Sequence, residues 1–137
     1  MKANPTRRAL LVLATAGLVV SAGRASAEIC ELVTISGTIT NVANGPVPVG
    51  TISIRLEEQG VMDVAARKIA EVEVDSDGSR HSVPFTMKVR KSAVDTTIDP
   101  GFTIRLERDG RLTATNTTKQ SYSGGSDVSL LIEPILY

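Results

Sequence analysis

A chain of 137 residues with one cysteine and one histidine can form no internal disulfide, and these two residues do not specify a transition-metal site. Its fifteen basic residues equal its fifteen acidic residues in number, so the net charge is zero and the chain has no excess of positive charge. Binding to nucleic acid requires a face rich in lysine and arginine to neutralise phosphates, so no nucleic-acid partner is predicted.

Residues 1–27 have the pattern of a cleavable signal peptide. Arg7 and Arg8 belong to a basic segment, Ala9–Val20 is an uncharged apolar run, and Ala25-Ser26-Ala27 supplies the small residues that a signal peptidase requires. The apolar run has 12 residues, whereas a membrane-spanning helix needs about 18 or more. We therefore predict cleavage after Ala27.

The export route stays open between two pathways. Thr6–Leu11 (TRRALL) resembles a twin-arginine motif, and paired arginines are also common in signals of the general secretion pathway. Either route places the remaining domain, residues 28–137, outside the cytoplasm. Four basic residues and no acidic residue precede the cleavage point, so the mature domain of 110 residues has a net charge of −4.

Cys30 is the third residue of the predicted mature chain. A lipidated cysteine follows small residues, whereas Cys30 follows Glu28, which is charged, and Ile29, which is β-branched. No lipid anchor is therefore expected. The sequence leaves two interpretations of Cys30 open: a free thiol in an N-terminal segment, or a disulfide between two chains.

Alternation of apolar and polar residues predicts seven strands in the mature domain. In the first strand, Val33, Ile35 and Ile39 alternate with serine and threonine, and Gly37 completes the inner face. In the fourth strand, Pro84 limits the hydrogen bonding of the ladder. The predicted strands span residues 33–40, 52–57, 70–75, 83–89, 102–106, 112–114 and 128–132.

Short strands separated by turns predict an all-β fold. Asn44-Gly45-Pro46 and Asp99-Pro100-Gly101 are turn sequences, and Val61–Arg67 tolerates a helix but would span barely two turns. We predict a small two-sheet β-sandwich of about seven strands, of the immunoglobulin-like Greek-key type. A closed or partly open barrel is the alternative.

The hairpin around Asp109-Gly110 has two possible registers. A two-residue loop sets Arg108 opposite Arg111, two like charges, and leaves Leu112 on the polar face. A three-residue loop, 108–110, keeps the apolar residues on one face and gives Gly110 the left-handed position. We predict the three-residue loop, because the buried face determines register. It pairs Glu107 with Arg111, Leu106 with Leu112 and Ile104 with Ala114.

No catalytic, cofactor-binding or metal-binding residue is predicted, and the domain is not expected to be an enzyme. His81 has no neighbouring elbow or oxyanion motif. Asp75–Ser79 resembles the start of a calcium loop but has Thr86 where the closing glutamate belongs, so a turn is favoured. Glu57 and Glu58 are neighbours on a strand and point to opposite faces.

The succession of strands and turns resembles the YbaY/YscW-type envelope lipoproteins over about residues 34–134. The segments that carry the resemblance are Ser36–Ile39, Pro48–Gly50, Ile52–Glu57, Met62–Ala66, Ile69–Glu71, Val83–Phe85, Ile98–Pro100, Asp109–Leu112 and Leu130–Pro134. The resemblance implies a β-sandwich in the envelope of a Gram-negative bacterium, where some relatives act as pilotin-like chaperones of the outer-membrane secretins of type III secretion. It supplies no catalytic residues, and this chain departs from the family in lacking the lipidation cysteine.

Two functions stay open at this point. The first is a binding or assembly module, periplasmic or secreted, whose protein partner is a secretion or outer-membrane component. The second is a structural envelope protein that self-associates. For the first, we predict that Thr51–Glu57 or Phe102–Leu106 provides a permissive strand edge if the topology leaves that strand open, because these strands carry few outward charges.

Overall fold

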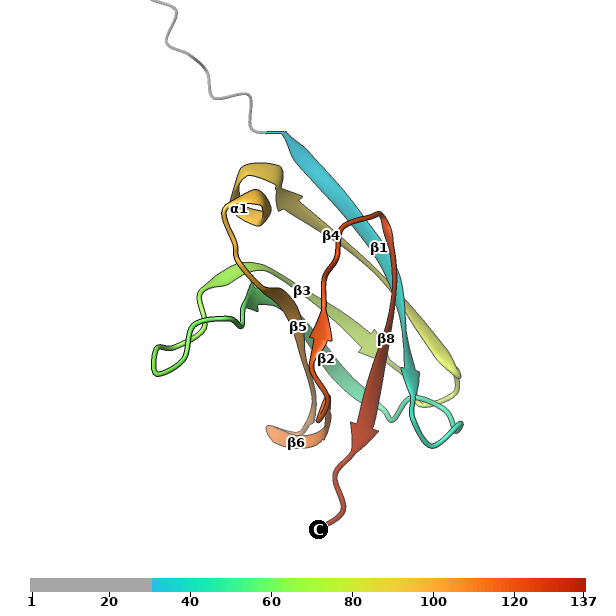
Figure 1. The fold of residues 1–137 in the computed structure, drawn as a ribbon. Coiled ribbons are helices and arrows are strands. Elements are labelled where there is room, and N and C mark those ends of the chain that lie inside the picture. The colour runs from blue at the N-terminus through green and yellow to red at the C-terminus, as the bar shows by residue number, and fades with distance from the viewer. Residues whose placement is uncertain (1–30) are drawn as a thin grey trace, which may run out of the picture.

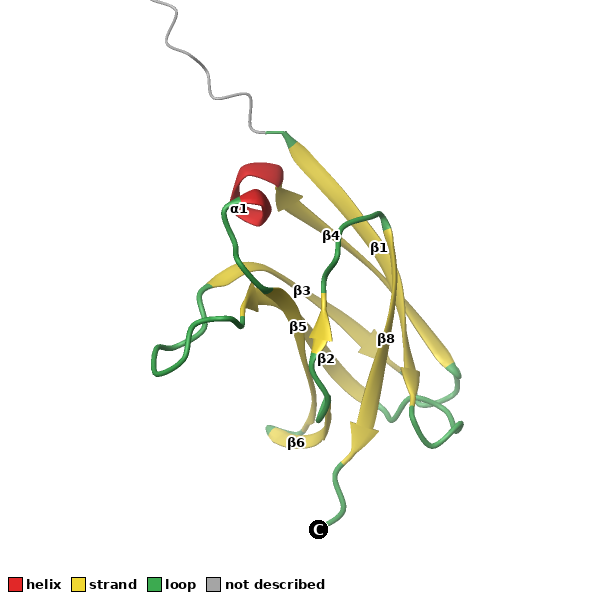
Figure 2. Ribbon diagram, in the orientation of Figure 1, coloured by secondary structure: helices red, strands yellow, loops and turns green. Residues whose placement is uncertain are grey.

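The computed structural model describes residues 31–137 (Figure 1). The predicted signal peptide with its paired arginines, the cleavage point after Ala27, and Cys30 lie outside the described residues. The described part is built of strands with one short helix (Figure 2). The elements are β1 (Leu32–Asn41), β2 (Gly50–Glu58), β3 (Lys68–Ser76), β4 (Ser82–Arg90), α1 (Lys91–Asp95), β5 (Pro100–Arg108), β6 (Arg111–Thr115), β7 (Gln120–Ser121) and β8 (Asp127–Pro134).

All seven predicted strands are confirmed, each within one observed strand. Two short elements were not predicted. The helix α1 is a single turn after β4, with an ion pair of 2.6 Å between Lys91 Nζ and Asp95 Oδ2. The strand β7 has only two residues, too few for an alternation to be visible. Residues 61–67, which tolerate a helix, form a loop.

The strands form one continuous path in the order β3-β2-β5-β6-β8-β1-β4, with β7 paired to β5 beside the path. The pair β1–β8 is parallel, and the other pairs are antiparallel. Because β6 pairs with both β5 and β8, it joins what would otherwise be two separate sheets. The all-β prediction is confirmed. The two-sheet sandwich is not confirmed, because the sheet is nearly closed, as in the barrel alternative (Figure 1).

The core fills the inside of this barrel. The inward residues of β2 are Ile52, Ile54 and Leu56, and all three are fully buried, as predicted from their alternation with polar residues. The inward residues of β5 and the other strands, together with Val47 and Tyr122 from loops, complete the cluster. The remaining core residues are Ile35, Ile39, Val47, Val83, Phe85, Met87, Val89, Phe102, Ile104, Leu106, Ala114, Tyr122, Leu130 and Ile132.

The register of the β5–β6 hairpin differs from the prediction. Arg108 lies opposite Arg111 and Glu107 opposite Leu112, so the loop is the two-residue Asp109-Gly110. Asp109 has φ 53° and Gly110 has φ 76°, and two successive positive φ angles are typical of the type I′ turn that two-residue hairpins favour. The left-handed Gly110 is therefore confirmed, and the three-residue loop with its pairings is wrong.

A β-bulge explains how the hairpin with a two-residue loop still places an apolar residue of β6 in the core. The register shifts between Leu106 and Glu107, so Leu106 lies opposite Ala114. Ala114 is fully buried, whereas Leu112 is only half-buried. The extra residue in β6 restores the inward orientation of Ala114. The alternation of apolar and polar residues in the sequence does not reveal such a bulge.

The two opposed arginines of this hairpin each have another neighbour. Arg108 Nε lies 3.8 Å from Asp109 Oδ2, and the guanidinium carbon of Arg111 lies 4.0 Å from the centre of the Tyr137 ring. The carboxylate and the aromatic face each attract a cation. The like charges are thus tolerated at an exposed position.

Replacing Gly110 by alanine is expected to lower the free energy of unfolding by about 1 kcal/mol. A Cβ at this position would meet no atom within 4 Å, so the cost arises from the positive φ angle alone. Denaturant titration of the two proteins measures the difference. Gly110→Asn is the control, because asparagine tolerates left-handed backbone and should lose less. Alanine that matches glycine in stability would contradict the assignment.

Candidate functional site

One buried carboxylate ties two loops together at the end of the barrel where β2 ends. Glu58 is only 8 % exposed. Its Oε1 accepts hydrogen bonds from the backbone N–H groups of Gly60 and Asp99, both at 3.0 Å, and its Oε2 accepts one from Ile98 at 2.9 Å. The bases of the loop 59–67 and the loop 96–99 are therefore fixed side by side.

The environment of Glu58 favours its charged form. Burial raises the pKa of the Glu58 carboxyl. The hydrogen bonds from the backbone N–H groups of Ile98, Gly60 and Asp99 together lower this pKa by more than burial raises it, so it lies below its ordinary value of 4.5. The neighbouring Glu57 accepts a hydrogen bond from the Thr103 hydroxyl on the outer face. The prediction that the two glutamates point to opposite faces is thus confirmed, and the two carboxylates do not act together.

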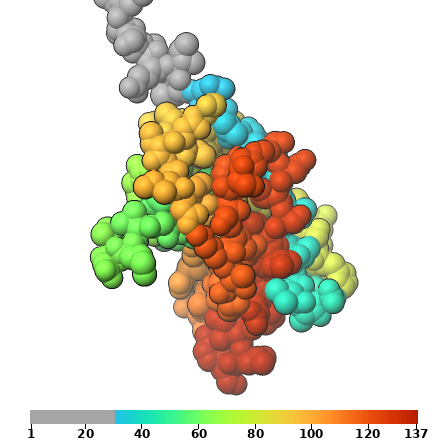
Figure 3. Space-filling view, in the orientation of Figure 1, coloured from blue at the N-terminus to red at the C-terminus, as the bar shows by residue number. Residues whose placement is uncertain are grey.

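Further hydrogen bonds hold the same two loops. The N–H of Gln59 donates to the carbonyl oxygen of Asp99 at 2.9 Å, and the N–H of Glu58 donates to that of Arg67 at 2.9 Å. The Arg67 guanidinium in turn donates to the Thr97 hydroxyl at 3.3 Å. The loop 59–67 therefore starts and ends on fixed anchors, although its middle projects from the barrel (Figure 3).

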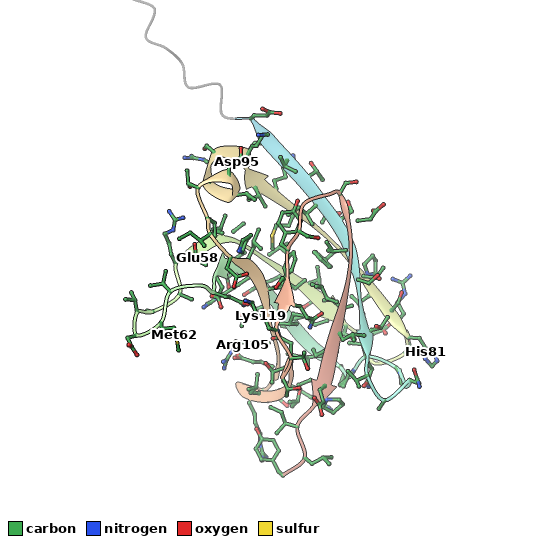
Figure 4. The ribbon with its side chains drawn as sticks, in the orientation of Figure 1. Glu58, Met62, His81, Asp95, Arg105 and Lys119 are labelled. Atoms are coloured by element: carbon green, nitrogen blue, oxygen red, sulfur yellow. The ribbon has the colours of Figure 1, made fainter. Side chains whose placement is uncertain are left out.

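Four exposed apolar side chains on these loops form what we call the apolar tip: Val61, Met62, Val64 and Ile98. Their exposed fractions are 49 %, 85 %, 66 % and 86 %, respectively. Met62 lies at the outer end of the projecting loop, beyond Glu58 at its base (Figure 4). Apolar side chains gathered on the surface beyond the scattered single residues of an ordinary protein mark interaction sites, and methionine adapts to irregular partners.

The strand that follows this loop, β3, is one of the two edges of the sheet; the other is β4. The prediction that Thr51–Glu57 or Phe102–Leu106 forms an edge of the sheet is wrong. They lie in β2 and β5, and each of these strands has hydrogen-bonded neighbours on both sides. In this sheet, the strands with few charged outward side chains are therefore central strands.

The two faces of β3 differ in chemistry. Its outward side chains Glu71, Glu73 and Asp75 are exposed acids, and its inward side chains Val72 and Val74 are only half-buried. The facing residues of β2 are by contrast fully buried. In the described part of the chain β3 pairs with β2 alone, and β4 contacts it without pairing.

Glu71 is the best-neutralised of these acids. Its carboxylate contacts Lys68 Nζ at 3.0 Å, the Ser53 hydroxyl at 2.9 Å and Arg55 Nε at 3.2 Å. These contacts lower the pKa of Glu71 to about 2 from an ordinary value of 4.5, and the contact with Lys68 has the largest effect. The charge of Glu71 is therefore already balanced within the domain.

Acidification is expected to destabilise the domain through Glu71. A folded-state pKa below the unfolded one means that the stabilisation is complete above pH 4.5 and is lost as the pH falls toward about 2. Denaturant titration between pH 6 and pH 2 measures the loss, and Glu71→Gln should reduce the slope. Glu107→Gln, also on an outer face, is the matched control; an identical slope for wild type and Glu71→Gln would contradict the assignment.

The other residues considered from the sequence lie apart from this end. His81 and Ser82 are exposed, and His81 lines a shallow hollow together with Asn44 and Leu131. The turn interpretation of Asp75–Ser79 is supported, because Asp77 Oδ1 accepts hydrogen bonds from the N–H and hydroxyl of Ser79. Among residues 31–137, no group of three or more histidine, cysteine, aspartate or glutamate side chains is placed to hold a metal ion.

Sequence reasoning did not find the role of Glu58 or the apolar tip. The partners of Glu58 are all backbone groups, and two of them, Ile98 and Asp99, lie 40 and 41 residues away in the chain, so no side-chain motif marks them. The only available signal was a carboxylate at an inward position of a strand. In the described region, no helix has the length and apolar character to span a membrane.

Comparison with known proteins gives one informative likeness. No family model matches the chain, and no curated protein matches it. A solved structure of an alternative pilotin from the type II secretion system of Vibrio cholerae resembles it with a TM-score of 0.68 at 15 % sequence identity. The likeness covers 78 % of this chain and 100 % of that one. At this identity the likeness establishes the fold: this chain has the all-β fold of that pilotin.

Proposed function

We propose that this protein is a non-catalytic module of the bacterial cell envelope that binds another protein and assists its assembly, in the manner of a pilotin. The observation that carries the proposal is the likeness of the whole domain to a secretion pilotin. The apolar tip supports it, because exposed apolar side chains on anchored loops suit a protein partner. The partner proposed is a secretion or outer-membrane component.

The proposal includes export and processing. We infer that residues 1–27 are removed and that residues 28–137 act in the periplasm as a domain without a lipid anchor, related to the YbaY/YscW-type proteins. The composition of the first 27 residues supports this, as do Glu28 and Ile29 directly before Cys30, where a lipidated cysteine follows small residues. The intact mass of the protein recovered from the envelope checks it, and an acylated Cys30 would contradict it.

Co-purification from the envelope of the native bacterium tests the function. We expect the tagged protein to retain one outer-membrane or secretion component, identified by mass spectrometry. Met62→Asp and Ile98→Asp should each abolish this retention, because a charge at the apolar tip opposes apolar contact. Both residues are largely exposed, so the variants should fold normally.

His81→Asp is the matched control, since it introduces the same residue at an exposed position far from the tip (Figure 4). It should retain the component. Retention of no such component, or equal retention by wild type and both tip variants, would contradict a binding role for the tip. Sedimentation of the protein alone distinguishes the alternative, because a self-associating structural protein would form oligomers as its concentration rises.

A further inference from the structure

The hydrogen-bond pattern identifies which backbone groups of β3 are free. The N–H of Ile104 donates to Asn116 on the β6 side of β5, so the odd-numbered residues of β5 direct their backbone groups to β2. Because backbone groups alternate in direction along a strand, those of the even-numbered residues of β2 point to β3. Those of the even-numbered residues of β3, which lie opposite them, point to β2. The N–H and C=O groups of Glu71, Glu73 and Asp75 consequently point away from β2, to the side of β3 that no strand pairs with, although β4 contacts part of β3.

The side chains at these free positions are acidic, and two of them lack a cationic partner. Glu73 makes no ion pair among residues 31–137. Asp75 accepts a hydrogen bond from the Thr51 hydroxyl at 3.3 Å, which leaves its charge unbalanced. In an antiparallel pair, directly opposed side chains share a face and lie about 5 Å apart. A strand added here would therefore be favoured by lysine or arginine opposite Glu73 and Asp75.

The inner face at the same edge is apolar and incompletely covered. Ala70, Val72 and Val74 pack against the core but remain half-buried. The residues of an added strand that alternate with the basic ones would lie opposite Val72 and Val74. Valine or isoleucine at those positions would complete the cover, because β-branched side chains pack well on a half-buried sheet face.

We propose that the free edge of β3 accepts an extended segment of a partner protein in which basic residues alternate with β-branched apolar residues. The segment adds to β3 as an antiparallel strand and takes its hydrogen bonds from Glu71, Glu73 and Asp75. This inference rests on the proposed function, in which the partner is a protein. It names the chemistry of the segment that the partner presents.

The other edge and a second copy of the chain are less suitable. The N–H of Ser36 donates to Ser126, beside β8, so the odd-numbered residues of β1 and β4 pair and Pro84 faces the open side of β4. That edge lacks a donor at Pro84 and its inner residues are already buried. Pairing of β3 with β3 of a second copy would bring acidic side chains against one another, which is unfavourable.

Synthetic peptides test the proposal on the mature protein. The probe has the length of β3, nine residues, and alternates lysine with valine; the controls alternate glutamate with valine, or place the same lysines and valines in two blocks. Titration calorimetry should show binding of the first peptide alone. Glu73→Lys should weaken it about ten-fold or more, because a basic residue then faces a basic residue.

Two further variants separate the edge from general charge effects. Glu73→Pro removes an N–H that points away from β2, so the β2–β3 ladder survives while the site for the peptide is lost. Asp127→Lys makes the same change of charge as Glu73→Lys on a different strand, β8, and should bind the peptide as wild type does.

Peptide binding that is unchanged by Glu73→Pro, binding of the glutamate peptide, or no binding at all would overturn the proposal. A dimer of the free protein that Glu73→Lys abolishes would do so as well, since the occupant would then be a second copy. These outcomes are separable from failure of the proposed function. An envelope component still retained by Glu73→Pro would overturn only the β3 inference, whereas peptide binding without any retained component would overturn only the function.

Discussion

Replacing Phe102 by alanine is expected to lower the free energy of unfolding by about 4 kcal/mol. The ring is fully buried in β5 and meets Tyr122 edge to face, with 5.8 Å between ring centres. Removing the ring loses the free energy gained by its transfer from water to the core. It also leaves a cavity, whose surrounding atoms lose their contacts with the ring. Because domains of this size are stable by only about 5–15 kcal/mol, the variant should approach the threshold of folding.

Chemical denaturation at neutral pH measures this loss. Phe102→Leu is the conservative control, because it retains most of the buried volume, and should cost much less than alanine. Tyr137→Ala tests specificity, since Tyr137 is an aromatic residue that is 79 % exposed. Should Phe102→Ala be no more destabilising than Tyr137→Ala, the placement of Phe102 in the core would be wrong.

Gly37→Ala is the second change with a large expected effect, about 2–3 kcal/mol of destabilisation. A Cβ on Gly37 would lie 2.4 Å from the carbonyl oxygen of Val128, 2.6 Å from Val128 Cγ2 and 2.8 Å from the Phe85 ring. Gly37 lies between these residues, which face it from β8 and β4. The backbone oxygen cannot move without disturbing the β1–β8 pairing, so the strands would have to separate.

Gly45→Ala is the matched control for this effect, because a Cβ there would meet nothing closer than 3.9 Å. Thermal and denaturant unfolding should distinguish the two variants clearly, with Gly45→Ala near wild type. Similar stability of Gly37→Ala and wild type would mean that β8 does not approach β1 as closely as the structure has it.

The strands could be predicted from sequence because their cause is local. Alternation of apolar and polar residues places the inner face of each strand on the core, as in Ile52, Ile54 and Leu56 of β2, whatever the order of strands. The order itself depends on contacts between distant segments. The pairing of β6 with both β5 and β8, which nearly closes the barrel, leaves no signature within β6.

The candidate site was less accessible to sequence reasoning for the same reason. Few outward charges on β2 and β5 suggested open edges, yet these strands are central and the edge strand β3 carries the acids. Charge is a device by which proteins protect edges, so the acids of β3 are the better indicator. The hairpin at Gly110 gives a parallel case, because a bulge restored the inward face that alternation alone assigned to another register.

Hydrogen exchange of the β3 amides tests the binding surface most directly. In the free protein, the N–H groups of Glu71, Glu73 and Asp75 should exchange rapidly, because they point away from β2 and no other strand pairs with them, while those of Val72 and Val74 are protected by β2. Addition of the envelope component retained in co-purification should protect the first set. Protection confined to β4, or no change in β3 upon binding, would contradict the assignment of β3 as the edge that the partner occupies.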